Sequence, residues 1–124
     1  MTETKQEKLV EILQGLRKVS AMQGSAVISR DGLTIAADMP KDVDEETFAA
    51  MSAAMQGAAE TAISELKQGG LNQIIIDASK GKMITIGAGT LAILVVLAKP
   101  EVNLGLILLE MKKTSSKIAS TVGG

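Results

Sequence analysis

The chain has 124 residues, a length that suits a single domain (1–124) with one hydrophobic core. Its 46% hydrophobic and 22% charged residues are typical of a globular protein and exclude intrinsic disorder. The 13 basic and 14 acidic residues provide no positive field for nucleic acid, and the absence of cysteine excludes disulfides and thiolate zinc sites.

The first part of the chain predicts a helix followed by a hairpin. Thr4-Lys5-Gln6-Glu7 has the form of a capping box, and apolar residues at helical spacing then extend the predicted helix from about Lys5 to Val19. Ser25 to Ser29 and Leu33 to Asp38 are typical of two short strands. The Asp-Gly pair between them is a strong hairpin signal.

A second helix is predicted to begin near Asp44 and to end at about Leu66. The acidic residues around Asp44 indicate its start, because acidic side chains are stabilising at a helix N-terminus. Two of its sides look suited to burial. One is a stripe of larger residues: Phe48, Met51, Met55, Ala62, Ile63 and Leu66. The other is a surface of small residues: Ala50, Ala53, Ala54, Gly57, Ala58 and Thr61.

The last part predicts three strands and a helix. Leu71 to Ala78 and Met83 to Gly87 read as a second hairpin, and the unbroken apolar run Leu91 to Ala98 reads as a central strand covered on both faces. Asn103 is a plausible cap for a final helix, whose apolar residues are Leu104, Leu108, Met111, Ile118 and Val122. The order α-β-β-α-β-β-β-α predicts an α+β fold with a five-stranded antiparallel sheet and helices on both faces.

Sites for chemistry are weakly supported. The chain lacks histidine, cysteine, tyrosine and tryptophan, which removes most general bases, nucleophiles and metal ligands. The acidic group Asp38, Asp42, Asp44, Glu45 and Glu46 lacks calcium-loop spacing and is explained by helix capping. The segment 87–92 fits a loose dinucleotide pattern but leads into a strand instead of a helix. We expect no catalytic residue, no cofactor, no metal and no enzymatic activity.

The second helix with its following strand indicates an interface. Its small residues suit either close approach to the chain's own sheet or close approach of a partner helix. In the second case the helix would join the strand that begins at Leu71 in a two-fold symmetric dimer. The interface residues would be Ala50, Ala53, Ala54, Gly57, Ala58, Thr61, Leu71, Gln73, Ile75 and Asp77.

No export signal or membrane span is indicated. The start of the chain is polar where a signal peptide needs an apolar core. The apolar run 91–98 is far shorter than the roughly 20 residues that cross a bilayer as a helix. We therefore expect a cytoplasmic protein without a membrane partner.

The segment from Gly24 to Ala36, GSAVISRDGLTIA, resembles the first hairpin of the roadblock/dynein light-chain family. The alanine-rich helix 48–66, the hairpin 71–87, the apolar strand 91–98 and the closing segment 103–111 follow in family order. The resemblance, to a small standalone prokaryotic-type roadblock domain, covers about Lys5 to Ile118. These are packing and turn patterns, which identify a fold better than an activity.

The resemblance implies a profilin-like or longin-like domain that forms homodimers or heterodimers by joining sheets edge to edge. It also implies a non-enzymatic role as regulator or scaffold of a Ras-like small GTPase, which would rest across the paired second helices. The alternatives are a structural adaptor of a larger complex and a small-molecule sensor. Of the two arginines, Arg30 at the turn and Arg17 on a helix, neither is a strong candidate for an arginine finger.

Overall fold

The computed structural model describes residues 3–19 and 21–123 and confirms the predicted order of helices and strands. All strand pairs are antiparallel. The elements are α1 (Lys5–Arg17), β1 (Met22–Ser29), β2 (Thr34–Asp38), α2 (Glu45–Glu65), β3 (Ile74–Ala78), β4 (Gly81–Ala88), β5 (Ala92–Ala98) and α3 (Leu104–Val122).

The three helices begin where the capping residues in the sequence predicted. The capping box of Thr4 and Glu7 is formed in both directions, and the side chains of Asp44 and Asn103 accept from the backbone N–H groups of Thr47 and Leu106. These bonds satisfy amides that a helix leaves unpaired at its start. The sequence signals therefore fix the starts of all three helices.

Several boundaries differ from the predicted ones. The first helix ends at Arg17 instead of Val19, and β1 begins three residues before Ser25. The larger difference is in β3, which begins at Ile74 instead of Leu71. Of residues 71–73 only Leu71 is apolar, Asn72 and Gln73 are polar, and the ladder to β4 starts only at the pair Ile74–Thr85.

The strand order β2-β1-β5-β4-β3 places β5 at the centre and leaves β3 and β2 as the two edges. The run predicted as a central strand, 91–98, is β5, which begins one residue later at Ala92; its residues are buried on both faces except for Leu97, which is half-buried. Leu94 pairs with Val27 on one side and Ile86 on the other, and all three are buried. Alternate residues of β5 thus feed two separate cores.

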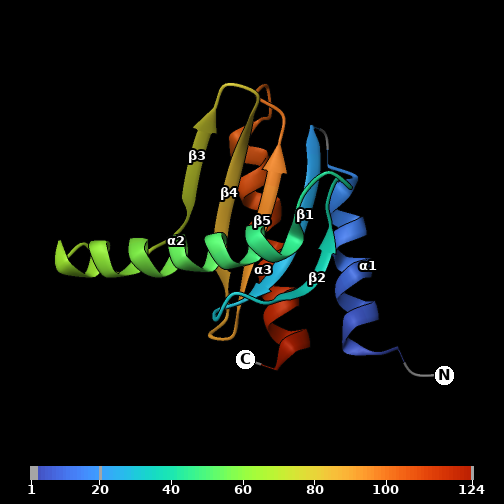
Figure 1. The fold of residues 1–124 in the computed structure, drawn as a ribbon, viewed down its shortest axis with the longest axis horizontal. Coiled ribbons are helices and arrows are strands. Elements are labelled where there is room, and N and C mark those ends of the chain that lie inside the picture. Colours follow the sequence, from blue (N-terminus) through green and yellow to red (C-terminus); the bar gives the residue numbers. More distant parts are fainter. Residues whose placement is uncertain (1–2, 20, 124) are drawn as a thin grey trace.

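Helices lie on both faces of this sheet, with α1 and α3 on one face and α2 on the other (Figure 1). The core beneath α1 and α3 is the larger and contains Leu13, Leu94 and Met111. The core beneath α2 is small and consists of Ala26, Ile28, Ala49, Ile93 and Val95. The α2 face is therefore the more thinly covered of the two.

Two glycines should respond in opposite ways to alanine. Gly32, in the β1–β2 turn, has φ +93°, and a Cβ there would lie 3.3 Å from the Cα of Ala50. Gly15 is helical, and a Cβ there would meet no atom within 4 Å. We expect Gly32→Ala to lower the free energy of unfolding by about 1–2 kcal/mol and Gly15→Ala to raise it by about 1 kcal/mol. Urea denaturation measures both, and equal effects would contradict the turn geometry.

The N-cap of α2 should make stability depend on pH. The backbone N–H of Thr47, its hydroxyl and the N–H of Glu46 lower the pKa of Asp44 below its ordinary 3.8. A lowered pKa stabilises the folded state above the ordinary value, and this contribution is lost as the pH falls through the folded value. The stability difference between the wild type and Asp44→Asn should therefore shrink in acid, as urea denaturation over a pH series would show. A difference that grows in acid would contradict this assignment.

Candidate protein-interaction surface

Helix α2 is longer than the sheet beneath it is wide. Its 21 residues span about 32 Å at 1.5 Å per residue. The five strands cover only about 19 Å from edge to edge at their usual spacing. The helix crosses the strands and its C-terminal part projects past β3 (Figure 1). Its second half, from Gly57 on, therefore has little of its own chain to cover it.

The side of α2 that faces the sheet includes only part of the stripe of larger residues that the sequence suggested: Phe48 packs against the core beneath the helix. The buried residues are Ala49, Ser52 and Gln56. By contrast, Met51 and Leu66 of the expected stripe are 62% and 65% exposed. The sheet face beneath α2 carries branched side chains from β1 and β5, and the small residues Ala49 and Ser52 are buried on the helix there.

The predicted small-residue surface divides into two parts. Ala50 and Ala53 lie against the β1–β2 turn, where a Cβ on Gly32 would come within 3.3 Å and 3.8 Å of them. Ala53 packs against the core beneath α2, so contact within the chain itself explains its small side chain, whereas the side chain of Ala50 is exposed. The remaining four are exposed, and a Cβ on Gly57 would meet no atom within 4 Å. They are Ala54, Gly57, Ala58 and Thr61.

Strand β3 is the sheet edge nearest the overhang of α2. Ile75 and Ile76 point to opposite faces by strand alternation, yet each is 38% exposed. Asp77 is exposed and pairs with Lys82 of β4 at 3.1 Å. Leu71 and Gln73 precede the strand and are half-buried. An edge strand with apolar residues on both faces is open to pairing with another strand.

Part of the sheet face on the α2 side is uncovered. Ile76, Met83 and Leu97 are neighbours across β3, β4 and β5, and Met83 packs against the core beneath α2. With Gln23 they line a shallow hollow of about 350 Å³. We call this hollow the shelf. The shelf lies beside the β3 edge, on the face of the sheet that α2 crosses (Figure 1).

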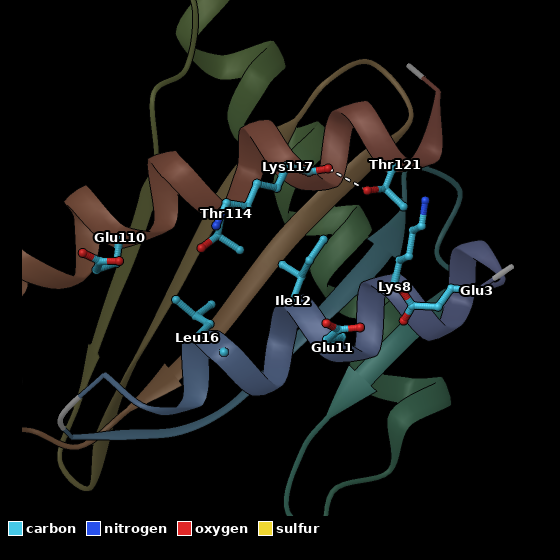
Figure 2. A pocket seen from close by; sticks show the side chains of 10 residues that line it. Glu3, Lys8, Glu11, Ile12, Leu16, Glu110, Thr114, Lys117 and Thr121 are labelled. Atoms are coloured by element: carbon cyan, nitrogen blue, oxygen red, sulfur yellow. Dashed lines mark hydrogen bonds between the residues drawn. The ribbon is translucent and has the colours of Figure 1, made fainter. Parts of the chain in front are cut away.

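A second hollow lies on the opposite face, between α1 and α3 (Figure 2). Its volume is about 490 Å³, and Glu3, Lys8 and Glu11 line its α1 side. A side-chain hydrogen bond between the two carboxyl groups, together with charge repulsion from Glu11, raises the pKa of Glu3. These side chains are exposed, whereas small-molecule sites are mostly apolar and bury most of the ligand. The hollow gives no support to a small-molecule sensor.

Both arginines form ion pairs within the chain. Arg17 lies 3.0 Å from a carboxylate oxygen of Asp38. Arg30 lies 2.7 Å from Glu60 of α2, and its Nη2 also donates to the carbonyl of Gly89 at 3.0 Å. The Arg30 contact was not predicted from the sequence. The one available signal was Gly87 within a strand, since glycine there often marks the close approach of another group.

The acidic segment that precedes and begins α2 serves the N-terminus of that helix. Asp44 caps the helix, and Glu45 and Glu46 lie in its first turn. In residues 3–19 and 21–123, no cluster of three or more metal-ligating side chains is present. In the same ranges no helix is long and apolar enough to cross a membrane.

These features define a profilin-like α+β domain whose exposed apolar surface is a projecting helix beside a sheet edge. The Roadblock/LC7 domain family matches residues 8–98, and the chain belongs to that family. It is 43% identical over 107 residues to an uncharacterised protein of Methanocaldococcus jannaschii, MJ0310, covering 86% of this chain and 93% of that one. A second protein of that organism, MJ0714, matches at the same identity and covers 90% of its own length.

Solved structures show the same fold. An MglB protein in a tetrameric arrangement has a TM-score of 0.88 at 20% identity, covering 98% of this chain and 92% of its own. Gliding protein MglB from Thermus thermophilus has a TM-score of 0.86 at 21% identity, with 98% and 93% covered. Profilin II of Acanthamoeba castellanii reaches 0.62 at 20% identity, with 96% and 99% covered. The predicted family and fold are confirmed.

Proposed function

We propose that this protein is a non-enzymatic interaction module that pairs with a second copy of itself through α2 and β3. The residues that form the contact are those predicted from the sequence, with Gly57 near the centre of the helix surface. The dimer regulates or positions a Ras-like small GTPase in the cytoplasm. The observation that carries the proposal is the projecting half of α2 beside an open sheet edge.

The geometry supports pairing because the projecting part of α2 in one copy can cover the shelf that is uncovered in the other. When two β3 strands pair antiparallel about a two-fold axis, the sheets join into one. The half of each α2 that projects past its own β3 then lies over the partner's sheet, where the shelf is uncovered. Exposed apolar side chains of both elements, including Met51, Leu66 and Ile76, become covered.

A GTPase would then bind across the two α2 helices. This surface exists only in the dimer, so binding there would favour one arrangement of the GTPase switch loops over another. Because both arginines are held in ion pairs within the chain, the effect would come from shape and not from an inserted arginine. A heterodimer with another roadblock protein would use the same two elements.

The alternative is a structural adaptor that joins larger complexes and leaves nucleotide turnover unchanged. Both alternatives require the dimer, and they differ in the response of a partner GTPase. A panel of purified Ras-like GTPases, each loaded with GDP or with a GTP analogue, should therefore be titrated with the wild type and with a monomeric variant. Nucleotide-dependent binding by the dimer alone supports regulation. Equal binding of both nucleotide states supports the adaptor, and no binding by any member contradicts a GTPase partner.

A further inference from the structure

Two polar contacts hold the middle of α2, at Gln56 and Glu60, to the sheet. The apolar core beneath the helix lies near its start, around Ala49. Further along, the hydroxyl of Thr85 donates to Gln56 Oε1 at 3.0 Å, and both residues are buried. One turn beyond, Arg30 Nη1 donates to Glu60 Oε2 at 2.7 Å. The helix then projects past the sheet edge (Figure 1), so these two contacts fix its direction there.

The side chain of Arg30 occupies space on the sheet surface next to Gly87. The residue follows β1 in register with Ile28, on the face that α2 covers. Its guanidinium extends to the β4–β5 turn, where it donates to the carbonyl of Gly89 at 3.0 Å. A Cβ on Gly87 would lie 2.9 Å from Arg30 Nη2, so any other residue at that position would displace the guanidinium. The missing side chain at Gly87 is what makes room for this contact.

From this geometry we infer that Arg30 is a positioning residue for self-association. It joins the β1–β2 turn, the β4–β5 turn and α2, and so holds the projecting half of α2 at a fixed angle to the β3 edge. Dimerisation requires α2 and β3 to meet the partner together, so a loosened helix weakens the dimer although Arg30 itself lies away from the contact. The inference rests on the proposed dimer through these two elements.

The contribution of this ion pair to overall stability is small. The side chains of Arg30 and Glu60 are 32% and 41% exposed, and ion pairs in contact with water stabilise little. Its effect on assembly is larger because a small change of angle at Glu60 is amplified along the projecting half of the helix. Loss of this ion pair should therefore change the dimer affinity and the helix direction more than it changes the free energy of unfolding.

A double-mutant cycle tests the inference in the full chain. We expect Arg30→Ala and Gly87→Ala each to raise the dimer dissociation constant about tenfold in sedimentation velocity experiments. The double variant should be no weaker than either single variant, because both substitutions remove the same contact. Arg17→Ala, which breaks the pair with Asp38 on the opposite side of the sheet, is the control and should leave the constant unchanged. Additive effects or an unchanged constant in Arg30→Ala would overturn the inference.

A distance measurement separates this inference from the dimer on which it rests. The chain has no cysteine, so spin labels can be placed at Glu65→Cys, in the projecting half of α2, and at Lys80→Cys, beside β3. In the monomeric Gly57→Arg background, the label-to-label distance distribution should broaden when Arg30 is replaced by alanine. Broadening in a protein whose wild type proves monomeric would support the positioning role and overturn the dimer. An unchanged distribution would overturn the positioning role alone.

Discussion

Gly57→Arg is expected to convert the dimer into a folded monomer. Gly57 lies on the exposed side of α2, where a Cβ would meet no atom within 4 Å, so the new side chain causes no clash within the chain. In the dimer it would bring a bulky cation into the close contact between two helices. We expect the dissociation constant to rise by about 100-fold or more, equivalent to about 3 kcal/mol. Sedimentation velocity over a concentration series measures the change.

Gly15→Arg is the matched control for this experiment. Gly15 is also an exposed helical glycine with open space around its Cβ, but it lies in α1 on the opposite face of the sheet. The same change in charge and size there should leave the dissociation constant unchanged. If the two variants weaken the dimer equally, the effect is one of net charge. If neither does so, the exposed side of α2 is not the contact.

Leu94→Ala is expected to have the largest effect on stability. Leu94 belongs to the central strand β5, is 0% exposed and lies in the larger core beneath α1 and α3. Truncation removes buried apolar surface and leaves a cavity that the paired strands on both sides prevent from closing. We expect the free energy of unfolding to fall by about 3 kcal/mol in urea denaturation.

Leu91→Ala controls for the loss of the same atoms in the same segment. Leu91 precedes β5 in the β4–β5 turn and is 51% exposed. Its truncation should cost less than about 1 kcal/mol. A similar loss in both variants would contradict the assignment of β5 as the central, doubly covered strand.

The fold could be predicted because local signals and the burial pattern agreed. Thr4, Asp44 and Asn103 marked the helix starts, and the unbroken apolar run 91–98 indicated a central strand. Strand ends were less predictable. Leu71 is apolar like the strand that follows it, but the polar residues Asn72 and Gln73 lie between them, and β3 begins only where its ladder to β4 starts, at Ile74.

The candidate surface was only partly predictable. Small residues at helical spacing indicated a close contact, and Ala54 and Ala58 are indeed exposed. The sequence did not distinguish them from Ala53, which packs against the core beneath α2 in the same chain. The contact between Arg30 and Glu60 joins residues 30 positions apart, so no local pattern reveals it.

The central claim is that two copies meet at β3, and disulfide cross-linking of single-cysteine variants tests it most directly. Across a two-fold axis the central residue of β3 lies opposite itself, close enough for a disulfide. Single cysteines at positions 74 to 77 should therefore give, under mild oxidation, a species of twice the 12.9 kDa chain mass at the position nearest the axis. A cysteine at Ala37 in the opposite edge strand β2 should give none. Cross-linking no stronger at β3 than at β2 would contradict the proposed assembly.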